Sequence, residues 1–272
     1  MTNPARTFLY VPGDRPERVA RALTSSADAV IVDLEDAVKP ERKADARATV
    51  QSIEGLVWRY GIELWVRINS GDMGRADLIL IGELTTLTGL VLAKCESTAW
   101  ITEVAEAVGA LVKLSPLVES AVALRDVHEL AEHARTSRLQ LGEIDLLADL
   151  GASPPASAVL LDHARCALVV ASVAAGIEPP VGGVHLAVDD LVSLRESGAY
   201  LQSLGFGGRA LIHPSHCDIT NEVFSPTEAD IAWAHDVLNR LASSTAGAVR
   251  DANGAMLDEA VVRRARRLIR PL

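Results

Sequence analysis

The chain has 272 residues, a length that suits one α/β barrel or two smaller domains. Hydrophobic residues make up 49% of it but aromatic residues only 4%, so the core must be built from Ala, Val, Leu and Ile. The net charge of −10 argues against nucleic acid as the main partner. In so acidic a chain, an anionic substrate would need local Arg or Lys, or a cation.

Features that report on the cellular compartment indicate a cytoplasmic protein. Cys95, Cys166 and Cys217 are scattered and form no CxxC pair, which favours reduced thiols over a disulfide framework. Residues 1–14 contain no apolar run of signal-peptide length, and no later segment reads as long enough to span a membrane.

Eight apolar segments recur along the chain, separated by segments that are mostly of helical period. Their bounds, in chain order, are 7–11, 29–34, 64–69, 89–94, 111–119, 138–142, 184–188 and 209–214. Strand–helix alternation of this length predicts a TIM (β/α)8 barrel, with a doubly wound open sheet as the alternative. Neither GxGxxG nor GxxxxGK[ST] follows a strand, so no nucleotide-binding fingerprint supports the open sheet.

The pattern changes after the eighth segment. A helix is predicted over 226–241, a turn at Asn253-Gly254 and a basic helix over 258–269. We therefore expect residues 1–222 to form the barrel and residues 223–272 to form a C-terminal helical extension, either a lid or an arm that packs on a neighbouring subunit.

Most of the predicted strands end in polar residues, which would converge on one mouth of a barrel. These residues are Asp14, Arg15, Arg18, Asp33, Glu35, Asp36, Arg67, Asn69, Lys94, Glu96, Glu119, Glu143 and Asp145. Carboxylates from two strands, together with substrate oxygens, suit Mg²⁺. Arg67 and Arg15 could bind carboxylates or phosphates.

Polar residues at strand ends and in loops also have interpretations that involve no function. An acid after a strand often caps the next helix, and Asp189-Asp190 is assigned to that class. Lys94 and Glu96 could form a solvated pair, and His213 and His216 read as loop histidines rather than metal ligands. No GxSxG nucleophile elbow is present. The functional hypothesis therefore rests on the convergence of many strand ends.

Eight motifs in order make the chain resemble the citrate lyase β-subunit-like enzymes of the HpcH/HpaI aldolase superfamily. The motifs occupy residues 9–18, 32–38, 66–69, 92–97, 117–120, 142–151, 205–216 and 225–238. The resemblance implies a TIM barrel with a C-terminal extension, Mg²⁺ as cofactor and a homo-oligomer, either a trimer or a hexamer. It also implies cleavage or formation of a carbon–carbon bond between an α-keto acid and the acetyl unit of a thioester such as an acyl-CoA.

The resemblance also suggests a role for each matching residue. Glu119 and Asp145 match the metal ligands, and Arg67 matches the arginine that holds the keto-acid carboxylate. Asp258 resembles a lid aspartate that acts as acid or base from a neighbouring subunit. The other matches are Asp33, Glu35 and Asp36 in the acidic cluster, Lys94 and Glu96 after the fourth strand, and Arg15 and Arg18 near the CoA or carrier phosphates. Arg67, Asp258 and Asp36 are thus expected to take part in catalysis, and Arg15, Arg18, Arg67, Lys94 and Glu35 to bind substrate or CoA.

Three positions depart from the family pattern. The usual Gly-Ala-Glu-Asp is Gly142-Glu143-Ile144-Asp145 here, Ala93 replaces a proline before the lysine, and no proline follows Asp258. The preferred hypothesis is a Mg²⁺-dependent lyase of a short β-hydroxyacyl-CoA such as malyl- or citramalyl-CoA. The alternatives are a citrate lyase β-subunit acting on citryl-acyl carrier protein, a non-catalytic paralogue that binds keto acid or acyl-CoA, and an aldolase for free keto acids.

Overall fold

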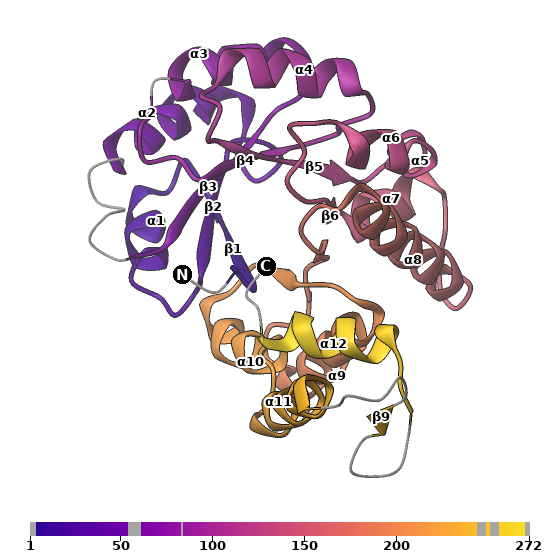
Figure 1. Cartoon of the computed structure of the whole chain (residues 1–272). Helices are drawn as coiled ribbons and strands as arrows, with labels where there is room; N and C mark the ends of the chain where they lie inside the picture. Colours follow the sequence, from indigo (N-terminus) through magenta and orange to yellow (C-terminus); the bar gives the residue numbers. More distant parts are fainter. Residues whose placement is uncertain (1–3, 54–60, 83, 244–248, 251–255, 270–272) are drawn as a thin grey trace. The chain divides into compact units, whose positions relative to one another are not determined.

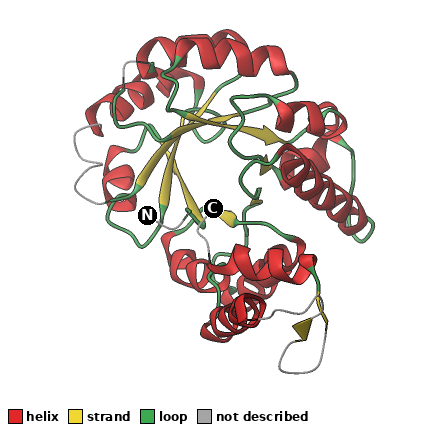
Figure 2. Cartoon of the chain, in the orientation of Figure 1, coloured by secondary structure: helices red, strands yellow, loops and turns green. Residues whose placement is uncertain are grey.

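Eight parallel strands close into a barrel in chain order, from β1 to β8, which confirms the predicted fold (Figures 1 and 2). The structure is a computed structural model and describes residues 4–53, 61–82, 84–243, 249–250 and 256–269. The strands are β1 (Thr7–Pro12), β2 (Ala29–Asp33), β3 (Glu63–Ile68), β4 (Gly89–Leu92), β5 (Lys113–Val118), β6 (Gln140–Leu141), β7 (Val181–Gly182) and β8 (Gly208–Leu211). β2 is buried on both faces, as expected for a strand inside a (β/α) barrel.

The predicted seventh strand over 184–188 is wrong. The strand is Val181–Gly182, where Val181 pairs with Gln140 of β6 and with Gly208 of β8. Residues 184–188 form a loop in which Leu186 is 64% exposed. The apolar run suggested a strand, but the register with the two neighbouring strands places the pairing earlier in the chain.

Helices lie around the barrel, between successive strands and after β8 (Figure 2). They are α1 (Pro16–Ala22), η1 (Pro40–Arg42), α2 (Lys43–Ile53), α3 (Gly71–Ile81), α4 (Thr98–Ala107), α5 (Ala121–Arg125), α6 (Val127–Glu132), α7 (Glu143–Asp149), α8 (Ser157–Ala175), α9 (Leu191–Leu204), η3 (Pro214–His216) and α10 (Cys217–Val223). Asp190 caps α9 by accepting the Ser193 N–H, as predicted for the Asp189-Asp190 pair.

α8 corrects the expectation that no segment is long and apolar enough to span a membrane. It has 19 residues, and its most apolar window has a mean hydropathy of 1.6. The helix nevertheless lies between β6 and β7 and packs on α6 and α7. Its buried side chains include Ala164, Leu168 and Ala171. A helix that packs on a barrel buries apolar residues in the same way, so packing also explains the apolar sequence of α8.

The buried side chains of the barrel unit form two clusters. The larger one includes residues of the strands and of the surrounding helices, such as Val30, Val32 and Val50. The smaller one fills the barrel interior and includes Phe8 and Trp65, whose rings meet edge to face with centroids 6.0 Å apart. The interior is therefore packed, as in other TIM barrels, and a ligand must bind at its mouth.

An ion-pair cluster lies near the amino ends of β5, β6 and β7. Arg138 is buried, its guanidinium lies 5.0 Å from the Phe8 ring centre, and it donates to Glu178 Oε2. Lys113 Nζ donates to Glu178 Oε1 at 2.7 Å. Burial raises the pKa of Glu178, but the Arg138 and Lys113 cations outweigh burial and hold that pKa below its usual range.

We expect Glu178→Gln to lower the free energy of unfolding at neutral pH by about 3 kcal/mol, because it leaves the buried Arg138 charge without a carboxylate. A lowered pKa stabilises the fold only where the carboxylate is ionised. The cost is therefore complete above the unfolded glutamate pKa of about 4.3 and disappears as pH falls through the folded-state value. Urea unfolding of both proteins at neutral and at acidic pH measures this, and a cost independent of pH would contradict it.

Among the described residues, the contacts divide the chain into a barrel unit, Ala5–Phe224, and a C-terminal unit that starts at Ser225 and also includes Pro4. The C-terminal unit contains α11 (Glu228–Ser243), β9 (Val249–Arg250), β10 (Met256–Leu257) and α12 (Glu259–Ile269). β9 and β10 pair antiparallel, and α11 packs on α12 through Ala234, Val237 and Ala265. The predicted turn at Asn253-Gly254 lies outside the described residues.

Candidate active site

A cavity of about 210 Å³ lies at the carboxyl ends of the barrel strands. One part of its wall carries acids and an arginine, and another part is apolar. The lining residues are Tyr10, Asp33, Ala37, Arg67, Leu117, Glu119, Gln140, Leu141, Gly142, Glu143, Ile144, Asp145, Val184, Ala210 and Ile212. Arg67, Glu119 and Asp145, predicted from three different parts of the sequence, thus line one cavity.

Arg67 on β3 is held by the acids that follow β2. Its Nε and Nη2 atoms each donate to Asp33 at 2.6 Å, and its Nη1 lies 3.3 Å from Glu35 Oε2. Burial lowers the pKa of Arg67, but the hydrogen bonds and charge of Asp33 outweigh it and raise that pKa above its usual value. Arg67 is therefore a fixed cation whose remaining N–H groups can bind an anion.

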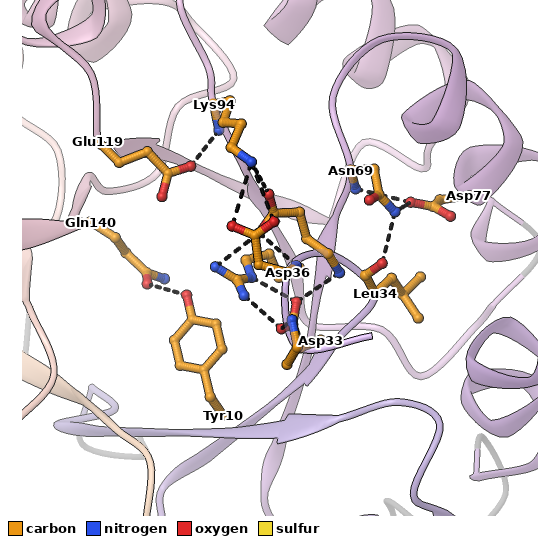
Figure 3. Close-up of polar contacts among 12 residues, drawn as sticks. Tyr10, Asp33, Leu34, Asp36, Asn69, Asp77, Lys94, Glu119 and Gln140 are labelled. Atoms are coloured by element: carbon orange, nitrogen blue, oxygen red, sulfur yellow. Dashed lines mark hydrogen bonds and ion pairs between the residues drawn. The ribbon is translucent and has the colours of Figure 1, made fainter. Parts of the chain in front are cut away.

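Buried Lys43 fixes the backbone of the acidic segment. Its Nζ donates to the carbonyl oxygens of Leu34 and Glu35 at 2.5 and 2.7 Å, and to Asn69 Oδ1 at 2.9 Å. Asn69 in turn donates to Leu34 O and to Asp77 (Figure 3). This network lies behind the acids and holds the segment that carries Glu35 in place.

Lys94 connects the acidic segment to the metal-ligand candidate Glu119 (Figure 3). Its Nζ donates to Glu35 Oε1 at 2.5 Å and lies 3.4 Å from the Asp36 carboxylate. Its φ of 48° is in the left-handed region that non-glycine residues seldom adopt, and its backbone N–H donates to Glu119 Oε1 at 2.6 Å. The strained backbone of Lys94 therefore orients the Glu119 carboxylate.

Glu119 is a buried carboxylate beside other acids. Burial raises the pKa of Glu119 to about 7, with further raising contributions from Glu35 and Asp145, although the Lys94 N–H and Arg67 lower it. A carboxylate in this environment gains from a cation placed against it.

The donor set around Glu119 fits a magnesium ion. Asp145 lies in the first turn of α7 and lines the same cavity. At Gly142 a Cβ would lie 2.6 Å from Glu119 Cβ and 3.0 Å from Glu119 Oε2, so the absent side chain leaves room beside the carboxylate. The described residues contain no cluster of three or more His, Cys, Asp or Glu built to hold a metal. Mg²⁺ binds two carboxylates together with water and substrate oxygens. A structural zinc site would instead have four Cys or His ligands.

A family model described as HpcH/HpaI aldolase/citrate lyase matches residues 6–214. The chain belongs to the HpcH/HpaI aldolase/citrate lyase family.

Three relatives illustrate the range of this family. A (3S)-malyl-CoA thioesterase of Cereibacter sphaeroides is 33% identical over 86% of this chain and 81% of its own. A citrate lyase subunit beta-like protein of Mycobacterium tuberculosis is 32% identical over 97% of this chain and 94% of its own. The crystal structure of CitE from Mycobacterium tuberculosis in complex with magnesium, acetoacetate and coenzyme A has a TM-score of 0.80 and 29% identity, covering 98% of this chain and 97% of its own.

Glu143, at one of the positions that depart from the HpcH/HpaI pattern, is tied to α8. Arg165 donates to both of its carboxylate oxygens, at 2.9 and 3.0 Å, and a Cβ on Gly183 would meet its side chain. Its neighbour Ile144 is half-exposed and lines the cavity. The changed loop therefore keeps Asp145 at the cavity and places an apolar side chain beside it.

Arg15 and Arg18 lie outside the cavity, on a basic surface. Both are exposed and line a second hollow of about 640 Å³ together with Lys39 and Arg42, so that its cations outnumber its two acids, Asp14 and Glu41. Arg18 also lines a third hollow of about 330 Å³ that shares Tyr10 and Ile212 with the cavity. An extended ligand could thus run from Arg67 to the basic surface along shared walls.

The predicted site residues Asp36, Glu96 and Asp258 are not among the residues that line the cavity. Asp36 is 59% exposed beside Lys94, and Glu96 accepts from Ser120 Oγ at 2.6 Å. Asp258 belongs to the C-terminal unit, where its Oδ1 accepts the Val261 N–H at 2.9 Å and so caps α12. His216 is buried at the end of η3, where its Nε2 bonds the Val188 carbonyl at 2.9 Å, so it lies in a short helix rather than in the predicted loop.

Sequence reasoning missed Tyr10, Gln140 and Lys43. Tyr10 Oη donates to Gln140 Oε1 at 3.1 Å across the cavity floor (Figure 3). Tyr10 and Gln140 lie in β1 and β6, within the predicted apolar segments, and Lys43 is the first residue of α2. A polar residue among the apolar residues of a barrel strand, as at Gln140, was the one available signal.

Proposed function

We propose that this protein is a Mg²⁺-dependent carbon–carbon lyase that cleaves, or forms, a short β-hydroxyacyl-CoA such as malyl-CoA or citramalyl-CoA. The products of cleavage are an α-keto acid and acetyl-CoA. The observation that carries the proposal is that Glu119, Asp145 and Arg67 line one cavity. This cavity shares wall residues with the 330 Å³ hollow, which is itself lined by Arg18 and lies next to the basic surface of Arg15 and Arg18. The CitE structure with magnesium, acetoacetate and coenzyme A supports it by homology.

The residues of the cavity divide the work of this reaction. Mg²⁺ held by Glu119 and Asp145 would supply Lewis-acid stabilisation of charge on the substrate oxygen during bond cleavage. Arg67, fixed by Asp33, binds the carboxylate of the keto-acid half and limits its motion. The ion pair between Lys94 and Glu35 holds the acidic segment in place. Asp36, at the exposed end of this segment, orients water.

Proton transfer completes the proposed chemistry. In cleavage a base takes the hydroxyl proton, the hydroxyl carbon becomes the keto carbonyl, and the electron pair of the broken carbon–carbon bond forms a thioester enolate that must gain a proton. We assign both proton transfers to Asp258 of a neighbouring subunit, whose carboxylate takes the hydroxyl proton and, once protonated, returns it to the enolate; in its own chain this side chain caps α12. Arg15 and Arg18 are assigned to the phosphates of CoA, since both are exposed cations at one hollow.

We expect metal-dependent release of a keto acid from one member of a panel of malyl-, citramalyl-, 3-hydroxy-3-methylglutaryl- and citryl-CoA. Each thioester is incubated with Mg²⁺ and with EDTA, and keto acid, acetyl-CoA and free thiol are measured together. Acetyl-CoA and keto acid in equal amounts, lost with EDTA, support the lyase. No turnover of any CoA ester contradicts it and favours a carrier-linked citryl substrate or a non-catalytic binding role.

Thioester hydrolysis is a second candidate, because the relative from Cereibacter sphaeroides is named a (3S)-malyl-CoA thioesterase. In that reaction water attacks the thioester carbonyl, the C–S bond breaks and malate is released with free CoA. The same panel separates the two reactions, since only hydrolysis gives free thiol without keto acid.

We further infer a cytoplasmic homo-oligomer, a trimer or hexamer. The three cysteines are free thiols, and α8 exposes Val159, Val170 and Val173 on its outer side. Light scattering of the purified protein gives the mass of the assembly, and a monomer at micromolar concentration would contradict the inference.

A further inference from the structure

Gln140 places an unused hydrogen-bond donor beside the cavity. The residue begins β6, is 1% exposed and lines the cavity. Its Nε2 is buried, and within the described part of the chain it has no hydrogen-bond partner. Buried amide groups are nearly always paired, so an unpaired one at the floor of a cavity requires an explanation.

Tyr10 fixes which end of the Gln140 amide is free. The Tyr10 hydroxyl donates to Gln140 Oε1 at 3.1 Å, so the oxygen is engaged and the NH₂ group remains. Tyr10 is itself held, because the Arg67 guanidinium lies 5.1 Å from its ring centre. The amide is thus oriented by a side chain that also contacts the cation of the site.

The strand register gives the depth of Gln140. It pairs with Leu117 of β5, two residues before Glu119. Side chains two apart on a strand point to the same face, so Gln140 lies one layer of side chains below Glu119. Tyr10, Leu117 and Ala210 line the cavity with it. A small ligand that contacts Glu119, Asp145 and Arg67 would therefore present its innermost atoms to Gln140.

The charged side chains that line the cavity indicate which ligand group accepts the hydrogen bond from Gln140. Among the described lining residues, side-chain donors come from Tyr10, Arg67 and Gln140, and the Tyr10 hydroxyl is already engaged. The other polar side chains there are acids, which repel an anion. A carboxylate in the inner part of the cavity has Arg67 and Gln140 as its donors.

We propose that Gln140 is a substrate-binding residue whose Nε2 donates a hydrogen bond to the carboxylate of the bound α-keto acid, and that Tyr10 is the positioning residue for its amide. This inference rests on the proposed function and adds a second protein donor to Arg67. It also gives a hydrogen-bond partner to Gln140 Nε2, which has none among the described residues.

The test is calorimetric titration of pyruvate into the full-length protein in the presence of Mg²⁺, with wild type, Gln140→Met and Tyr10→Phe. Methionine keeps the length of the side chain and removes both amide atoms. We expect the Kd of pyruvate to rise about ten-fold or more in Gln140→Met, the loss expected for a hydrogen bond to a charged group. The rise is smaller in Tyr10→Phe, and the Kd of Mg²⁺ does not change in either variant.

A control and a stability measurement separate binding from a structural role. Ser172→Ala removes a different buried polar group that has no partner in the described residues, a hydroxyl on α8 outside the cavity lining, and should leave the Kd of pyruvate unchanged. The double variant Tyr10→Phe/Gln140→Met removes both the hydroxyl of Tyr10 and the amide of Gln140, so neither group is left without its partner. Its melting temperature without ligand should equal or exceed that of wild type, because an unsatisfied donor has been removed.

The outcomes distinguish this inference from the proposed function. Equal pyruvate affinity in wild type and Gln140→Met overturns the role of Gln140 and leaves the lyase proposal intact. A lower melting temperature of the double variant with unchanged affinity assigns the pair to the fold alone and also overturns it. Wild type that neither binds pyruvate nor turns over any thioester overturns the proposed function, and this inference with it.

Discussion

Glu119→Gln is expected to lower carbon–carbon cleavage by at least about a thousand-fold and to weaken Mg²⁺ binding. Glutamine keeps the size of the side chain and an oxygen for the Lys94 N–H, which Glu119 accepts at 2.6 Å. It removes the negative charge that, with Asp145, would hold the cation. Initial rates with a saturating thioester and a calorimetric titration of Mg²⁺ measure the two losses.

The same variant is expected to be more stable than wild type when no metal is bound. Glu119 is a buried carboxylate whose pKa burial raises to about 7, so its ionised form is costly at neutral pH, and a neutral amide avoids that cost. Thermal melts in EDTA should therefore show a higher melting temperature for Glu119→Gln. Saturating Mg²⁺ should raise the melting temperature of wild type alone.

Glu96→Gln is the matched control. Glu96 follows β4 as Glu119 follows β5, but it is exposed, accepts from Ser120 Oγ and does not line the cavity. Activity, Mg²⁺ affinity and melting temperature should stay close to wild type. A Glu119→Gln protein with normal Mg²⁺ affinity would show that the cation is held elsewhere and would contradict the assignment.

The strand ends explain why so much of the site could be predicted from sequence. Asp33, Arg67 and Glu119 each lie at or just after the end of an apolar segment, and parallel strands of a barrel bring such ends to one mouth. Periodicity and composition were enough to predict the barrel, because apolar strands and amphipathic helices alternate along most of the chain.

What the sequence did not predict depends on packing and on register. The position of β7 follows from its pairing with Gln140 and Gly208, which a local apolar run cannot show. Lys43 reads as a surface lysine, and only the fold turns it inward to three oxygen acceptors. The left-handed backbone of Lys94 and the Tyr10–Gln140 bond are likewise products of tertiary structure.

The second large effect is expected for Asp33→Asn, which should lower the free energy of unfolding by about 3–5 kcal/mol. Asp33 is 1% exposed and accepts two hydrogen bonds of 2.6 Å from Arg67. It also accepts the backbone N–H groups of Glu35 and Ala37, at 2.9 and 3.1 Å. Asparagine keeps the shape but loses the charge, and its NH₂ group faces a donor. The buried Arg67 cation is then left with Glu35 alone.

Asp36→Asn, on the same segment, is the control that shows whether burial decides the effect. The Asp36 side chain is 59% exposed and lies 3.4 Å from Lys94 Nζ, so its loss should change the unfolding free energy by less than about 1 kcal/mol. Chemical denaturation of both variants measures the difference.

A double-mutant cycle then tests the reason for the effect. If Asp33 stabilises the fold by neutralising Arg67, adding Arg67→Met to Asp33→Asn should recover part of the lost stability, because the Arg67 cation that Asp33 paired is removed while Glu35 keeps its ion pair with Lys94. Additive losses would mean that Asp33 acts through the Glu35 and Ala37 amides instead. Activity separates the two roles, since the double variant regains stability without Arg67, the cation proposed to bind the keto-acid carboxylate, and should stay inactive.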